Sequence, residues 1–180
     1  DEVEDVLRKI EKILDDHRKR IEKNSRDMAR IIDEHRRKVE ERDHMVLHEY
    51  VNAAGITDRG EGDEETAEDV KAKLEKSNRE LEKHSEEVKR ALDESNEDLR
   101  RHSEEVKERI ERLVKKLRED GVEREEELKE VADRVKEKLD RLNRENEKSS
   151  EELKRELDKI NDENRETSER LKREIDETTR

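Results

Sequence analysis

The segment SNRELEKHSEEVK at residues 77–89 recurs eighteen residues later as SNEDLRRHSEEVK at residues 95–107. A second pair of related segments is LNRENEKSSEELKRELD at 142–158 and INDENRETSERLKREID at 160–176. Eighteen residues make five turns of an α-helix, so the repeat returns the same residue types to the same helical face. Such a repeat predicts nearly straight helices rather than a left-handed supercoil.

Glycines divide the chain into three segments of similar length. The four glycines are Gly55, Gly60, Gly62 and Gly121, and the chain has no proline that would kink a helix. Glycine suits helix ends and turns because it accepts positive φ angles. We therefore expect one domain at residues 1–180 with helices at about 1–54, 64–119 and 122–180.

Apolar residues in each segment alternate in steps of three and four, the spacing of a buried helical stripe. In the first two segments they pair with a constant sum of residue numbers, as in Val3 with Leu117 and Ile10 with Ile110. The second and third segments pair in the same manner, as in Ile110 with Val135. The sequence thus predicts an all-α fold, an up-down-up antiparallel bundle of three long, nearly straight helices.

The composition is 57% charged and 26% hydrophobic, with a net charge of −13 and no cysteine. Such values are typical of disordered chains, but also of long helices with a narrow apolar stripe, and the periodicity favours helices. The negative charge argues against nucleic acid as a partner. Because no apolar run could span a membrane and no signal peptide is evident, we expect a soluble chain without a membrane partner, cytoplasmic when expressed recombinantly.

Polar residues interrupt the apolar stripes at positions that face one another in the predicted register. A buried polar group is costly unless it is paired, so polar residues in register are typical of hydrogen-bond networks. The histidines have Asn and Ser as neighbours, which are weak zinc ligands, so we expect networks rather than a metal or cofactor site. The expected layers are His17, His102 and Asn143; Asn24 and Ser25 with Ser95, Asn96, Ser149 and Ser150; and His35, His84 and Asn161.

The close repetition, the helix-forming surface residues and the polar layers resemble computationally designed (de novo) helical bundles with buried hydrogen-bond networks. The many carboxylates belong to surface repeats and have no apolar pocket that would perturb their pKa values. We therefore expect no catalytic residues and no enzymatic activity.

Residues 42–57, RDHMVLHEYVNAAGIT, differ from the rest of the chain and contain its only aromatic residue, Tyr50. This strand stretch closely resembles the eleventh, C-terminal β-strand of green fluorescent protein in the form used for split reporters. The resemblance implies a partner, truncated green fluorescent protein lacking its last strand, and matches Glu49 to the glutamate beside the chromophore. Residues alternate between two sides as in a strand, and the expected reporter-binding residues are Met45, Val46, Leu47, His48, Glu49, Tyr50, Val51 and Asn52.

The strand stretch also fits the helical register, because Val46 with Leu74 and Tyr50 with Val70 share the constant sum of the other pairs. One interpretation is a designed switch or biosensor scaffold that cages the stretch as a helix and releases it to complement the reporter. The other is a passive tag. The repeat predicts Asn or Ser near residues 42 and 43, so Arg42 and Asp43 predict the loss of a polar layer there.

An alternative function is that of a helical bundle or oligomerisation module that carries the stretch as a tag. Asn146 and Asn164 lie beside the apolar stripe and leave room for a fourth helix. That helix would come from a second copy or from a designed helical key peptide. The histidine layers raise the further possibility of a pH-responsive bundle, because protonation of a buried imidazole is unfavourable.

Overall fold

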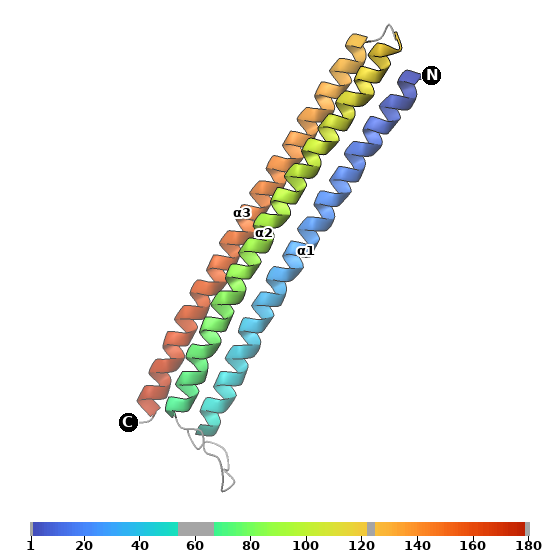
Figure 1. Ribbon diagram of the computed structural model, residues 1–180. Helices are drawn as coiled ribbons and strands as arrows, with labels where there is room; N and C mark the ends of the chain where they lie inside the picture. The colour runs from blue at the N-terminus through green and yellow to red at the C-terminus, as the bar shows by residue number, and fades with distance from the viewer. Residues whose placement is uncertain (1, 54–66, 122–124, 179–180) are drawn as a thin grey trace. The chain divides into compact units, whose positions relative to one another are not determined.

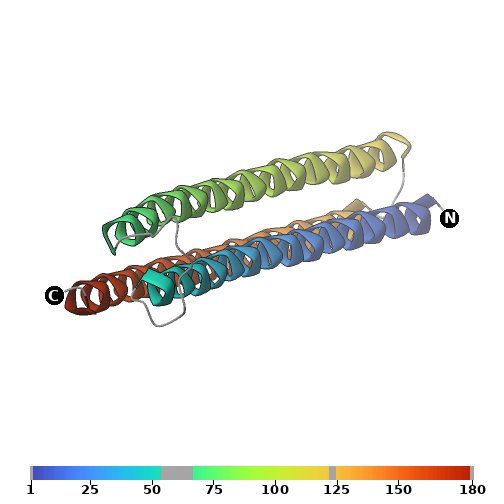
Figure 2. The same ribbon diagram turned by 90° about the horizontal axis from the view of Figure 1, so that it is seen from below.

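In the computed structural model the chain forms three helices, α1 (Glu2–Ala53), α2 (Ala67–Glu119) and α3 (Glu125–Thr178) (Figure 1). The structure describes residues 2–53, 67–121 and 125–178, and these contain no strand. Each helix is continuous over its described residues (Figure 2). The predicted all-α three-helix bundle is thus confirmed, while the predicted helix limits at 1, 54, 64, 122 and 180 lie outside the described residues.

Parts of all three helices make up each of two compact units. Unit 1 comprises residues 1–28 and 91–152, and unit 2 comprises residues 29–90 and 153–180. Neighbouring helices are antiparallel within each unit: in unit 1, His17 and Asn24 bond to His102 and Ser95, so numbers rise on α1 as they fall on α2. The constant-sum register read from the sequence describes the same pairing.

The core of unit 1 is a continuous apolar cluster drawn from one stripe of each helix. Ile10, Ile110 and Leu139, one from each helix, are completely buried in it. Steps of three and four residues place these side chains on one face of each helix, and burying such residues is the main favourable term in folding.

Unit 2 contains a smaller apolar cluster formed by Val46 of α1, Val70 and Leu74 of α2, and Leu171 and Ile175 of α3. Val46, Val70, Leu74 and Ile175 are completely buried. The predicted pairing of Val46 with Leu74 therefore corresponds to a shared core. One residue of the strand stretch is thus a structural member of the bundle.

The turn after α2 depends on a glycine. The Asp120 amide donates to the Lys116 carbonyl at 3.0 Å, and the Gly121 amide donates to the Arg118 carbonyl at 3.2 Å. Gly121 has φ 76°, a left-handed conformation that residues with a Cβ adopt only at a cost. A Cβ at this position would meet nothing within 4 Å, so the constraint is conformational rather than steric.

We expect Gly121→Ala to lower the free energy of unfolding by about 1 kcal/mol, because the positive φ disfavours a side chain. Urea unfolding followed by circular dichroism measures the change. Asp120→Ala is the matched control, because the described non-glycine residues all have negative φ. An equal loss in both variants would show that the positive φ is not the constraint.

Candidate functional site

The first histidine layer lies in unit 1 and joins all three helices. His17 of α1 is completely buried, and its Nδ1 lies 2.9 Å from Nδ1 of His102 on α2. Its Nε2 lies 3.1 Å from Oδ1 of Asn143 on α3. The Asn143 amide then donates to the Ser103 hydroxyl at 2.6 Å. The structure therefore brings together the three predicted residues and adds Ser103.

The second histidine layer lies in unit 2 and repeats this arrangement. Nδ1 of the completely buried His35 lies 2.8 Å from Nδ1 of His84, and its Nε2 lies 3.3 Å from Oδ1 of Asn161. The Asn161 amide donates to the Ser85 hydroxyl at 2.5 Å. An additional donor occurs here, because Nζ of Lys38 lies 3.3 Å from Nε2 of His84.

The hydrogen bonds of each layer run in one direction when both imidazoles are neutral. Because the Asn143 Oδ1 only accepts, His17 donates through Nε2 and accepts through Nδ1, which makes His102 the Nδ1 donor. The second layer has the same order, and Lys38 donates to the remaining ring nitrogen of His84. When both rings are neutral, each donor in the layer thus meets an acceptor. If both rings were protonated, the two facing Nδ1 atoms would both carry a hydrogen and could not bond.

Burial lowers the pKa of all four layer histidines, and it is the largest cause in each case. The hydrogen bonds to Asn143 and Asn161 act in the opposite direction on the pKa values of His17 and His35. The charges that act on the layers are Arg20 and Glu105 for the first, and Lys38, Glu34 and Glu87 for the second.

Sequence reasoning missed the two serines of the histidine layers. Ser103 and Ser85 are buried and accept the bonds that complete each chain. Each follows an α2 histidine in the repeated segment HSEEVK. The sequence contained the information that places these serines, because the constant sum of residue numbers pairs Ser103 with His17 and Ser85 with His35.

The serine–asparagine layer of unit 1 is only partly as predicted. Ser95 donates to Asn24 Oδ1, and the Asn96 amide donates to the Ser150 hydroxyl at 2.8 Å. The Asn146 amide donates to Asn96 Oδ1 at 3.0 Å, so Asn146 belongs to the layer. Ser25 and Ser149 are half-buried and provide none of these bonds between the described helices.

The predicted loss of a polar layer at Arg42 is wrong. The Arg42 side chain is buried, and a guanidinium has five donors that reach residues a shorter side chain could not. The Ser168 hydroxyl also donates to Asn78 Oδ1 at 2.9 Å. The strand stretch therefore supplies its own polar layer, the arginine layer, in which Arg42 donates to Asp43, Ser77, Asn78 and Asn164.

The strand stretch is helical through Ala53, and its last four residues lie outside the described part. Val46 is completely buried, whereas Met45 and Leu47 are 51% and 45% exposed. They are the large hydrophobic residues exposed among those described. A strand sequence alternates every two residues and a helix every 3.6, so the stretch cannot bury all its apolar residues as a helix.

The other expected reporter-binding residues occupy mixed environments. His48 is exposed and Val51 is half-buried, while the side chains of Tyr50 and Asn52 lie outside the described part. Oε1 of Glu49 lies 3.3 Å from Nζ of Lys73 on α2. The second carboxylate oxygen, Oε2, is buried without a hydrogen-bond partner, which is unfavourable for a charged group.

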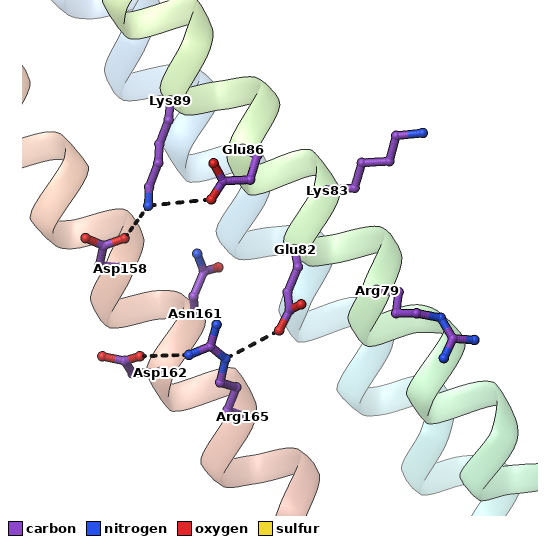
Figure 3. Close-up of a pocket in the computed structure, with 9 residues that line it drawn as sticks. All are labelled: Arg79, Glu82, Lys83, Glu86, Lys89, Asp158, Asn161, Asp162 and Arg165. Atoms are coloured by element: carbon purple, nitrogen blue, oxygen red, sulfur yellow. Dashed lines mark hydrogen bonds and ion pairs between the residues drawn. The ribbon is translucent and has the colours of Figure 1, made fainter.

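A groove of about 580 Å³ on α2 and α3 in unit 2 is lined mainly by charged residues (Figure 3). Lys89 lies between Glu86 and Asp158, and Arg165 reaches both Glu82 and Asp162 (Figure 3). These side chains pair with one another at the surface, where such pairs contribute little to stability. The groove has the character of a solvated seam between two helices.

Comparison with protein-family models, curated proteins and solved structures finds nothing that matches this chain. Over the described residues, none of the three helices is both long enough and apolar enough to cross a membrane. In the same residues, no group of three or more His, Cys, Asp or Glu side chains is arranged to hold a metal ion. The fold and its layers define an all-α three-helix bundle with buried polar hydrogen bonds.

We expect the bundle to lose stability as the pH falls below about 6.5, the ordinary histidine pKa. Because the folded-state pKa values are lowered, the unfolded chain binds more protons in this range, and acid favours unfolding. Denaturant unfolding at pH 7.5 and 5 measures the loss. Replacing all four layer histidines with Asn should reduce it. An unchanged loss would assign the acid response to carboxylates.

Asn164→Ala should destabilise unit 2 by about 1–3 kcal/mol, because it leaves the buried guanidinium of Arg42 without one acceptor. Asn146→Ala is the matched control, since it removes a buried asparagine one repeat earlier, in unit 1. Amide hydrogen exchange of residues 42–53 should accelerate only in Asn164→Ala. Equal exchange in both variants would argue against a local role of the arginine layer.

Proposed function

We propose that this chain is a de novo designed switch that cages a split green fluorescent protein strand as a helix. Opening of unit 2 releases residues 42–57, which then complete a truncated reporter that lacks its last strand. The chain makes and breaks no covalent bond in this scheme. Two structures compete for the same residues, and the free-energy difference between them sets the response.

The burial of Val46 is the observation that carries this proposal. Val46 lies in the apolar cluster of unit 2 while the surrounding backbone is helical. A barrel that takes the stretch as a strand must first separate Val46 from Leu74, Leu171 and their neighbours. The buried hydrogen bonds of Arg42 add to this requirement. A passive tag in a permissive connection would have no such contacts to break.

Several features lower the free energy needed to open this part of α1. Met45 and Leu47 gain less from the helical state than a core residue does, because each is about half exposed. Glu49 has an unpaired buried oxygen, and the last turn of α1 contains no basic residue that would favour the helix C-terminus. Segments with few buried apolar contacts open locally at lower free energy than the core.

The alternative of an assembly module receives less support from the described helices. Asn146 and Asn164 are buried in contacts among the three helices rather than lining a space for another helix. Among the described residues, only Met45 and Leu47 are large hydrophobics that remain exposed, and both belong to the strand stretch. The partly buried hydrophobics of unit 1, such as Leu7 and Leu113, pack against the core cluster of their own unit.

Complementation of a truncated reporter tests caging directly. The parent should complement more slowly than a free peptide of residues 42–57, and Leu74→Ala should accelerate it by opening a cavity beside Val46. Leu139→Ala is the matched control, because it removes an equally buried leucine from unit 1. Each substitution should cost about 2–5 kcal/mol, but only Leu74→Ala should raise the rate strongly.

Two results would contradict this scheme in different ways. Equal rates for the parent and the free peptide would rule out caging and leave the passive tag. Equal acceleration by Leu74→Ala and Leu139→Ala would show that release requires unfolding of the whole bundle rather than opening of unit 2.

A further inference from the structure

His44 and His48 stand four residues apart on α1, and both are exposed. Residues at this spacing are neighbours on a helix, with Cβ atoms about 5–6 Å apart. The fully buried Val46, midway between them, fixes their orientation, because residues two positions away on either side point away from the core. Their imidazoles therefore occupy adjacent turns on the outer face of the helix.

Two imidazoles one turn apart on a helix form a recognised arrangement for binding a transition-metal ion. Imidazole nitrogen suits Ni²⁺, Cu²⁺ and Zn²⁺, whereas Mg²⁺ and Ca²⁺ prefer oxygen ligands. The layer histidines are unsuitable, because they lie in hydrogen-bonded layers between the helices, whereas His44 and His48 lie at the surface of α1. Exposed carboxylates of Glu40 and Glu41, one turn before His44, add a negative potential that favours a cation.

We propose that His44 and His48 form a two-imidazole site for a divalent transition-metal ion on the helical form of α1. Water completes the coordination, in keeping with the absence of any metal-holding group of three or more ligand residues in the described part of the chain. The site is distinct from the buried layers. It lies within the strand stretch, but it uses residues on the face opposite Val46.

The site exists only while the stretch is helical. In a strand the same two residues are separated by about 13 Å, at roughly 3.3 Å per residue. One ion with metal–nitrogen distances of about 2.0–2.1 Å cannot bridge that gap. The ion therefore binds the closed helix and not the released strand. This consequence rests on the proposed function, whereas the metal site itself does not.

Binding to one conformation shifts the equilibrium by mass action. At a free ion concentration one hundred times the dissociation constant, the open fraction falls about 100-fold. A bound transition-metal ion therefore slows release of the stretch, and a chelator that removes the ion restores the rate. The chemistry uses no redox step and no covalent change.

Ni²⁺ is the probe, and two measurements separate the site from its consequence. Urea unfolding by circular dichroism, with NiCl₂ or with EDTA, should show a higher midpoint in Ni²⁺ for the parent. Complementation of the truncated reporter should be slower in Ni²⁺ for the parent, but unchanged for the free peptide of residues 42–57. MgCl₂ should have neither effect.

A matched variant preserves composition and charge while it removes the chelating geometry. The double substitution Glu41→His and His44→Glu leaves two exposed histidines seven residues apart, about 10.5 Å along the helix axis. This variant and His44→Gln should both lose the Ni²⁺ effect on the unfolding midpoint. Each variant is compared with itself in EDTA, so changes in basal stability cancel.

An equal rise of the midpoint in the parent and in the double variant would overturn the metal site. A rise confined to the parent, without slower complementation, would keep the site but contradict its control of release. If the parent and free peptide complement at the same rate in EDTA, the proposed function fails while the unfolding data still decide the site.

Discussion

The bond between two facing histidine Nδ1 atoms is the interaction on which the two histidine layers depend. Each buried imidazole must be both donor and acceptor. His17 and His35 therefore accept a hydrogen bond from a histidine of α2 and donate one to an asparagine of α3. A shift of any helix along its axis would leave these nitrogens buried and unpaired. Such a penalty fixes register more strictly than apolar contacts, which tolerate sliding because they have no direction.

The strand stretch obeys two incompatible periodicities. As a helix it places Arg42 and Val46 in the interior, where both find partners, but it leaves Met45 and Leu47 exposed. A strand would put Met45 and Leu47 on one side together with Glu49. The residues that fit the bundle poorly are therefore those that a strand would use together. In the proposed switch, the balance between these two sets of contacts sets the equilibrium between the helical and the released stretch.

Histidine has two different environments in this chain. Four side chains lie in layers where burial lowers their pKa values and neutral rings complete directed chains of hydrogen bonds. His44 and His48 lie at the surface of α1. The same ring is thus part of the buried layers in one setting and exposed to solvent in the other, and its position on the helix decides which.

The sequence by itself determined the three helices, their antiparallel order and the register of Val46 with Leu74, because spacing and constant sums depend only on helix geometry. It also located the histidine–asparagine layers. Only the tertiary structure decided that Ser103 and Ser85 complete those layers and that Arg42 restores a polar layer. The buried Oε2 of Glu49, which has no hydrogen-bond partner, could likewise be found only in the tertiary structure. Periodicity assigns a residue to a helical face, but hydrogen bonding depends on how far each side chain reaches across the interface and which atoms it meets there.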